Sequence, residues 1–180
     1  MNVTLLEKYN PEWPLWFTEI QAFLGEKVVN ACITIEHIGS TSIPGMIAKP
    51  IIDLNLVIER ERFGEIKQLL EDRGYYHEGD LGIKDREAFK FYAEALEKFL
   101  PTHHLYVTPK DSQELKRQTA FRDYLKKHKA DRERLSVLKW ALAEEYNNDK
   151  FLYMDGKDAT VKEITAKALA WYKKATSSKH

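Results

Sequence analysis

The spacing of hydrophobic and polar positions changes about two-thirds of the way along the chain. Before residue 110, apolar residues alternate between helical spacing and short runs typical of strands. This spacing predicts a helix from Leu15 to about Val28 and another within residues 59–75, stopped by Gly74. It predicts strands over residues 31–39, 51–58, 75–79, 88–95 and 102–109.

After residue 109 the spacing is helical only. Three apolar helical faces are expected, within residues 120–125, 135–146 and 161–171. Strands followed by helices indicate an α+β domain, with the helices over one face of the sheet. No repeat, low-complexity tract or Ser/Gly linker marks a boundary, so residues 1–180 are expected to form one domain.

The predicted strand over 51–58 carries two polar side chains in an apolar run. Asp53 and Asn55 share one face, about 7 Å apart along the backbone. The opposite face is unbroken and apolar, with Ile52, Leu54, Leu56 and Ile58. Two oxygen-bearing side chains at this spacing can hold Mg²⁺ against a phosphate. The alternative, in which Asp53 bonds to a loop amide with the help of Asn55, has equal weight from spacing alone.

The turn before this strand contains groups that can bind phosphate. The stretch "GSTSIPG" begins at Gly39, which offers backbone freedom, and continues with the hydroxyls of Ser40, Thr41 and Ser42. Lys49, at the far end, can neutralise phosphate charge. The spacing matches neither a P-loop nor a dinucleotide-binding glycine motif, so both are excluded.

The histidines form no recognisable zinc motif. His103 and His104 are adjacent on a predicted strand and point to opposite faces, with His104 on the same face as Tyr106. The chain has one cysteine, Cys32, expected to be a buried thiol, and no His-x-x-x-His pair on a helix. His37, just before the turn, either lines a phosphate pocket or ends its strand.

Composition narrows the choice of partners. Lys plus Arg and Asp plus Glu number 28 each, so no broad nucleic-acid surface is expected, although a local nucleotide pocket is compatible. The N-terminal stretch lacks a signal-peptide pattern, and no apolar run approaches the roughly 20 residues needed to span a bilayer. We therefore expect a cytoplasmic protein that does not cross a membrane.

Four motifs together resemble one known family. They are "YNPEWP", "EHIGSTSIPGMIAKPIIDL", "HHLYV" and "FRDYLKKH", spread in this order between about Tyr9 and Trp171. They resemble the GrpB (UPF0157) family, which is similar to the nucleotidyltransferase superfamily. The resemblance implies a nucleotidyltransferase-like mixed β-sheet packed with helices, with a C-terminal helical segment.

The resemblance also implies roles for particular residues. Gly39 and Ser40 would form the nucleotide-phosphate turn, and Asp53 would be the first metal ligand. Many superfamily members carry a second acid where this chain has Asn55, and His104 matches the third carboxylate position. The implied metal is Mg²⁺ or Mn²⁺, or a transition metal if His104 is a ligand.

Two functions follow from the resemblance. The first is metal-dependent transfer of a nucleotidyl group from an NTP to an unknown acceptor, with Asp53 and His104 as catalytic groups. The second is a non-catalytic module with a degenerate metal site, which binds a nucleotide or a coenzyme A precursor. A third reading, a purely structural or interaction protein, predicts that Asp53 is dispensable.

Overall fold

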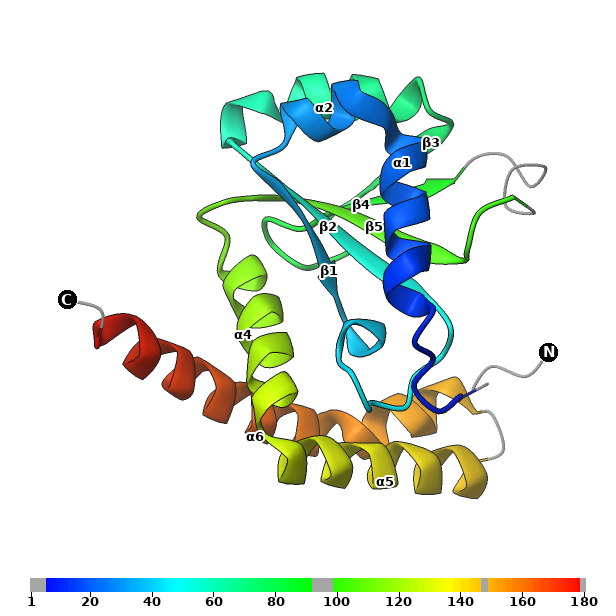
Figure 1. Cartoon of the computed structure of the whole chain (residues 1–180), viewed down its shortest axis with the longest axis vertical. Helices are drawn as coiled ribbons and strands as arrows, with labels where there is room; N and C mark the ends of the chain where they lie inside the picture. The colour runs from blue at the N-terminus through cyan, green and yellow to red at the C-terminus, as the bar shows by residue number, and fades with distance from the viewer. Residues whose placement is uncertain (1–5, 92–98, 147–148, 179–180) are drawn as a thin grey trace.

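Five strands form one mixed sheet in the order β1-β2-β5-β4-β3 (Figure 1). The structure, a computed structural model, describes residues 6–91, 99–146 and 149–178. β2 runs parallel to β5, and the other neighbouring strands are antiparallel. The strands are β1 (Thr34–Ile38), β2 (Ile52–Ile58), β3 (Tyr75–Gly79), β4 (Glu87–Phe91) and β5 (His103–Pro109).

Helices precede, interrupt and follow the strands. They are α1 (Trp13–Ala31), α2 (Phe63–Glu71), α4 (Gln113–Lys127), α5 (Lys129–Glu145) and α6 (Lys150–Ser177), with short 3₁₀ turns η1 (Ser40–Ser42) and η2 (Arg60–Arg62). The α+β class, with a mixed sheet and C-terminal helices, is confirmed. α1 begins two residues earlier than expected, because Pro14 suits the first helical turn. Residues 92–95 of the predicted strand 88–95 lie outside the described residues.

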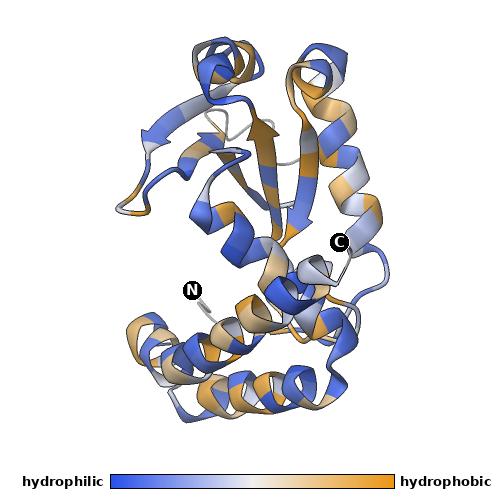
Figure 2. Ribbon diagram, turned by 90° about the vertical axis from the view of Figure 1, so that its left-hand side faces the viewer, coloured by the Kyte–Doolittle hydropathy of each residue, from blue (hydrophilic) through white to orange (hydrophobic). Residues whose placement is uncertain are grey.

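The apolar face of β2 builds the main core. Ile52, Leu54, Leu56 and Ile58 are at most 1% exposed and pack against α1 and α2, as their alternation predicted. Figure 2 shows that the central strands are the most apolar elements, whereas hydrophilic and hydrophobic colours alternate around the helices. Cys32 packs against this core, and burial raises the pKa of its thiol to about 12.

A second core joins the loop after β1 to the C-terminal helices. Ile43 and Met46, both fully buried, pack with Leu125 of α4, Leu135 of α5 and Ile164 of α6. The loop that carries η1 is therefore held between the sheet and the helical layer, as Figure 1 shows. This packing fixes the turn at residues 39–42 beside the N-terminal end of β2.

The expectation that the helices cover one face of the sheet is wrong. α1 and α2 cover the Leu54 face, whereas α4 packs on the opposite face, where Gln118 contacts Asn55. α5 and α6 lie beyond the strand ends (Figure 1). The cause is the interior position of β2 in the sheet: Asn55 and Val57 are 0% and 4% exposed, so both faces of this strand need a covering layer.

Candidate functional site

Asp53 and His104 form a hydrogen-bonded pair on neighbouring parallel strands. The register of β2 and β5 places the two residues opposite each other, and His104 Nδ1 lies 2.9 Å from Asp53 Oδ1. A carboxylate only accepts hydrogen bonds, so Nδ1 donates, and in the neutral imidazole Nε2 carries the lone pair. The His104 side chain is 54% exposed, so this lone pair is accessible. The pair thus offers an oriented base at the surface.

Gly39 allows the second oxygen of this carboxylate to reach the turn. Its φ of +73° lies in the left-handed region, and a Cβ atom there would fall 2.3 Å from Asp53 Oδ2. Both the backbone conformation and the close approach therefore require glycine. Asp53 bridges His104 on one side and the predicted phosphate turn on the other.

Two of the three hydroxyls in the turn already donate to main-chain carbonyls. Ser42 Oγ donates to the Gly39 carbonyl at 2.5 Å, and Thr41 Oγ1 lies 3.3 Å from the Ile51 carbonyl, to which it donates. Thr41 is also 3.0 Å from His37 Nε2. Ser40 is the hydroxyl that faces the helical layer.

His37 supports the turn from behind and does not line the site. It lies on the core face of β1, where its ring stacks on Phe17 with centroids 4.9 Å apart. The pKa of His37 is lowered to about 4, mainly by burial and to a smaller extent by the positive charges of Lys126 and Arg122. A neutral imidazole at this place bonds to Thr41 and holds the turn.

Lys139 of α5 is buried against the turn. Its Nζ atom donates to Ser40 Oγ at 2.7 Å and to the Ile47 carbonyl at 3.0 Å, and the residue is 5% exposed. Its pKa is lowered to about 7, mainly by burial and further by Lys157 and Lys49, with a partly opposing effect of Asp53. An anion bound beside this amine would raise its pKa and favour the charged form.

Two further lysines face the same region. Lys157 Nζ lies 4.8 Å and Lys49 Nζ 5.7 Å from the ring centroid of Tyr153, a buried residue of α6. Burial lowers the pKa of Lys157, with a further lowering by Lys49 and an opposing effect of Asp53. We call Lys49, Lys139 and Lys157 the lysine cluster. Three amines that repel one another beside one carboxylate are typical of a site for a multiply charged anion.

Sequence reasoning named Lys49 and missed the other two lysines. Lys157 looks like an ordinary lysine of a solvated helix face. Lys139 carried a weak signal, since it interrupts the apolar run "VLKWAL" of α5. Only tertiary packing brings Lys139 to Ser40 and Lys157 into the field of Lys139, Lys49 and Asp53.

Asn55 lies apart from the carboxylate with which it shares a strand face. It is fully buried; its Oδ1 accepts from Thr108 Oγ1 and its Nδ2 donates to Gln118 Oε1, each at 2.7 Å. The amide thereby joins β2, β5 and α4. Within the described residues, no three His, Cys, Asp or Glu side chains are grouped to hold a metal ion.

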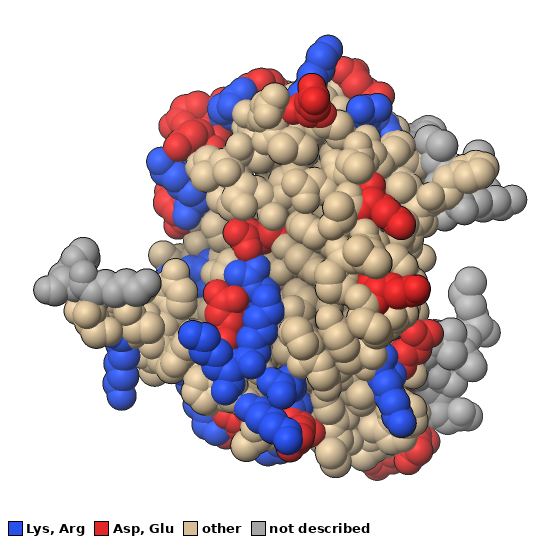
Figure 3. Space-filling model, in the orientation of Figure 1, with Lys and Arg blue, Asp and Glu red and all other residues tan. Residues whose placement is uncertain are grey.

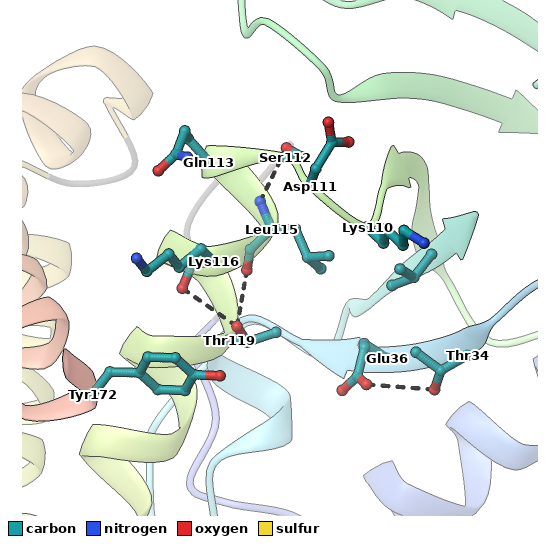
Figure 4. Close-up of a pocket in the computed structure, with 11 residues that line it drawn as sticks. Thr34, Glu36, Lys110, Asp111, Ser112, Gln113, Leu115, Lys116, Thr119 and Tyr172 are labelled. Atoms are coloured by element: carbon teal, nitrogen blue, oxygen red, sulfur yellow. Dashed lines mark hydrogen bonds between the residues drawn. The ribbon is translucent and has the colours of Figure 1, made fainter. Parts of the chain in front are cut away.

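A separate pocket lies where α4 begins (Figure 4). It has a volume of about 360 Å³ between the edge strand β1, the start of α4 and Tyr172 of α6. Its polar groups largely bond to one another: Ser112 caps the Leu115 amide, and Thr119 donates to carbonyls of its own helix. Asp53, His104, the turn at residues 39–42 and the lysine cluster do not line it, so we place the candidate site at Asp53.

The face in Figure 3 has mixed charge. Lysine and arginine side chains gather over α4 and α5, with acidic side chains among them. Ion pairs of this kind include those of Arg122 on α4 with Glu36 and Asp123, at 2.5 and 2.7 Å. No helix in the described part of the chain is long and apolar enough to cross a membrane.

Comparison with known proteins decides the family. The family model described as GrpB protein matches residues 3–167. The chain belongs to the GrpB family. The UPF0157 protein YqkA of Bacillus subtilis is 32% identical over 166 residues, which are 92% of this chain and 47% of that protein. The chain thus spans about half of that relative. The glutamate-rich protein GrpB of Alkalihalophilus pseudofirmus is 32% identical over 89% of this chain and 92% of its own length.

Solved structures support the same GrpB assignment and the wider fold. The crystal structure of the conserved protein GrpB from Enterococcus faecalis has a TM-score of 0.79 at 32% identity, covering 93% of this chain and 99% of that one. The structure of Cid1 in complex with the UTP analogue UMPNPP has a TM-score of 0.50 at 10% identity. It covers 73% of this chain and 40% of that chain. The second likeness shows a nucleotidyltransferase-like fold and nothing about activity.

Proposed function

We propose that this protein transfers a nucleotidyl group from a nucleoside triphosphate to the hydroxyl of an acceptor, with a divalent metal ion. One observation carries the proposal: Asp53 has His104 on one side and, through the Gly39 turn, Ser40 and the lysine cluster on the other. The carboxylate of Asp53 therefore lies between a base, His104, and a site that can bind several negative charges, the lysine cluster. The chemistry needs little more than positioning and charge stabilisation.

The lysine cluster suits the triphosphate. Lys139 and Ser40 are already hydrogen bonded at 2.7 Å, so their geometry is set before a ligand arrives. Lys49 and Lys157 add charge from the loop and from α6. A triphosphate bound here would place its α-phosphorus toward Asp53. His104 Nε2 would then take the proton of the acceptor hydroxyl.

The residues present fit one metal ion better than two. Mg²⁺ is commonly held by one or two carboxylates together with substrate phosphates and water. Asp53 Oδ2, which lies against Gly39, is the carboxylate oxygen that would hold the ion beside the phosphates. The ion would supply charge neutralisation there. Asn55 adds no charge and is bound to Thr108 and Gln118, which weighs against a second ion.

A second candidate is a non-catalytic module that binds a nucleotide or a coenzyme A precursor. The engaged amide of Asn55 favours it, since the superfamily's second acid is missing. Both candidates need the lysine cluster. They differ in whether Asp53 and His104 act on a bound ligand.

The test combines binding with turnover. We would measure thermal unfolding with each of four nucleoside triphosphates and with coenzyme A precursors, with and without Mg²⁺ or Mn²⁺. A ligand at about 100 times its dissociation constant stabilises by roughly 2.7 kcal/mol. Asp53→Asn should remove the metal-dependent part, and Asp158→Asn, on the exposed surface of α6, should not.

Turnover then separates the two candidates. Transfer from α-³²P-labelled triphosphate to a protein-free metabolite extract is expected for wild type and lost in His104→Gln, while binding is kept. Binding without transfer in wild type would favour the module. If no ligand of the panel raised the unfolding temperature of the wild type, both candidates would be rejected.

A further inference from the structure

A second pocket on the molecule has a surplus of basic side chains. It has a volume of about 620 Å³ and lies between the β3–β4 loop, the start of α4 and the C-terminal part of α6. We call it the basic pocket; its lining includes Ile83, Lys84, Lys116, Arg117, Leu169 and Lys173. A volume of this size suits a small molecule. No residue of the candidate site at Asp53 lines it, so a ligand here would occupy a separate site.

The carboxylate of the basic pocket is already paired. Glu114 is the one acid among the lining residues, and it accepts two hydrogen bonds from Arg117, at 2.7 Å from Nε and 2.6 Å from Nη2. The Glu114 side chain is only 10% exposed, so it stays with Arg117. Within the described residues, no acid forms an ion pair with Lys84, Lys116 or Lys173.

The acid that follows Lys84 in the chain is also bound to an arginine. Asp85 pairs with Arg60 at 2.7 Å, and Arg60 pairs with Asp111 as well, at 3.0 Å. These carboxylates are thus neutralised by a guanidinium, whereas the three lysines of the basic pocket keep their full charge. Amines that share one hollow repel one another, and an anion bound between them removes that repulsion.

The basic pocket shares a wall with the pocket in Figure 4. Gln113 and Lys116 line both. In Figure 4 the side chain of Lys116 extends away from Thr34 and Glu36, and Glu36 itself pairs with Arg122. The amine of Lys116 is therefore available to an anion in the basic pocket.

The rest of the lining is aliphatic. Ile83, Leu169 and Ala170 contribute apolar surface, and none of the described residues that line the basic pocket is aromatic. The methylene chains of the lysines extend this surface while their amines remain in water. Such a pocket suits a ligand with a charged group at one end and an uncharged organic group at the other.

We propose that the basic pocket binds a small organic molecule that carries a diphosphate group. The diphosphate lies among Lys84, Lys116 and Lys173, and the organic group contacts Ile83 and Leu169. Lysine binds phosphate as a point charge. A diphosphate matches three separate amines better than a single carboxylate does, because its charge is spread over two groups. The site is independent of the proposed function, since it needs neither Asp53 nor a nucleotidyl transfer.

Protein-observed ¹⁵N NMR tests this site with pyrophosphate, ADP, isopentenyl diphosphate and uncharged adenosine as probes. The amides of Lys84, Lys116 and Ala170 report on the basic pocket, and those of Gly39 and Ser40 report on the candidate site. We expect at least one organic diphosphate to shift the pocket signals with a lower dissociation constant than pyrophosphate, and adenosine to shift none. The tighter of the two identifies the organic group as a nucleoside or an aliphatic chain. Equal affinity for pyrophosphate and both organic diphosphates, or shifts confined to Gly39 and Ser40, would overturn the proposal.

Two double variants of equal charge locate the effect. Lys116→Gln with Lys173→Gln should weaken binding in the basic pocket at least tenfold. Lys129→Gln with Lys162→Gln removes the same charge from exposed lysines that pair with Glu133 and Asp158, and should change binding less than twofold. All four positions are on the surface of helices, so both proteins should fold. Equal weakening in the two double variants would reveal a general attraction of the surface for anions and overturn the proposal.

Two single variants separate the basic pocket from the lysine cluster and test its apolar lining. Lys139→Met should leave the shifts at Lys116 and Ala170 unchanged, because Lys139 does not line the basic pocket. Ile83→Ser should bring the organic diphosphates to the affinity of pyrophosphate and leave pyrophosphate unchanged. Loss of the pocket shifts in Lys139→Met, or an unaltered preference for organic diphosphates in Ile83→Ser, contradicts the site as proposed.

Discussion

Replacing Lys139 by methionine tests the central electrostatic feature of the site. Methionine keeps most of the length and apolar volume of the side chain and removes the amine that bonds to Ser40. In the wild type, burial and the neighbouring lysines lower the pKa of Lys139 from 10.5 to about 7. Each pKa unit corresponds to about 1.4 kcal/mol, so keeping this amine charged below pH 7 costs the folded state roughly 5 kcal/mol.

The pH dependence gives the sign of the effect. Because the folded pKa lies below the unfolded one, the unfolded chain binds more protons between about pH 7 and 10.5. The contribution of Lys139 to stability therefore rises with pH across this window. From pH 7 to pH 9 the wild type should gain about 2 kcal/mol relative to Lys139→Met.

Urea unfolding of both proteins at pH 6, 7, 8 and 9 measures this difference, with tryptophan fluorescence as the signal. Titrating groups that do not interact with Lys139 cancel, because they are common to both proteins. Lys129→Met is the matched control, since Lys129 is exposed and pairs with Glu133 on α5. If the free energy of unfolding changed with pH in the same way in wild type and Lys139→Met, the claim that Lys139 is a buried amine with a lowered pKa would be refuted. The same variant should lose triphosphate binding.

Two further substitutions test the packing of the site. Gly39→Ala should lower stability by about 2 kcal/mol, because φ is +73° and the new Cβ meets Asp53. Gly64→Ala, with open space around it, should be neutral or stabilising, and a similar loss in both variants by thermal unfolding would contradict this reasoning. Asn55→Asp should lower stability by about 2 kcal/mol in urea, since a buried carboxylate replaces the donor to Gln118. The loss should be larger at pH 8 than at pH 5, and an unchanged midpoint would show that Gln118 adapts by turning its amide.

The sequence was sufficient for most elements because local patterns cause them. Alternation along residues 51–58 gave both faces of β2, and the face assigned to the core is buried. Proline and glycine marked the turn before β2. The two histidines of β5 point as their adjacency required, with His103 bonded to Tyr75 and His104 to Asp53.

The sequence could not show which polar groups are satisfied by neighbours far along the chain. The sequence suggested that Asn55 acts together with Asp53, because both lie on the same face of the strand. In the fold it bonds to Gln118, 63 residues away. Hydrogen bonds to distant elements follow from packing, which periodicity does not encode.

The sequence alone determined the fold class, the turn and the strand that carries Asp53, because these depend on local spacing and on conformations that few residues adopt. Tertiary structure alone decided the electrostatics. It buried Lys139 against Ser40 and placed the guanidinium of Arg86 over the Tyr106 ring. Charge, burial and pKa depend on what lies within a few ångströms in space, and those neighbours come from segments about 20 to 100 residues apart.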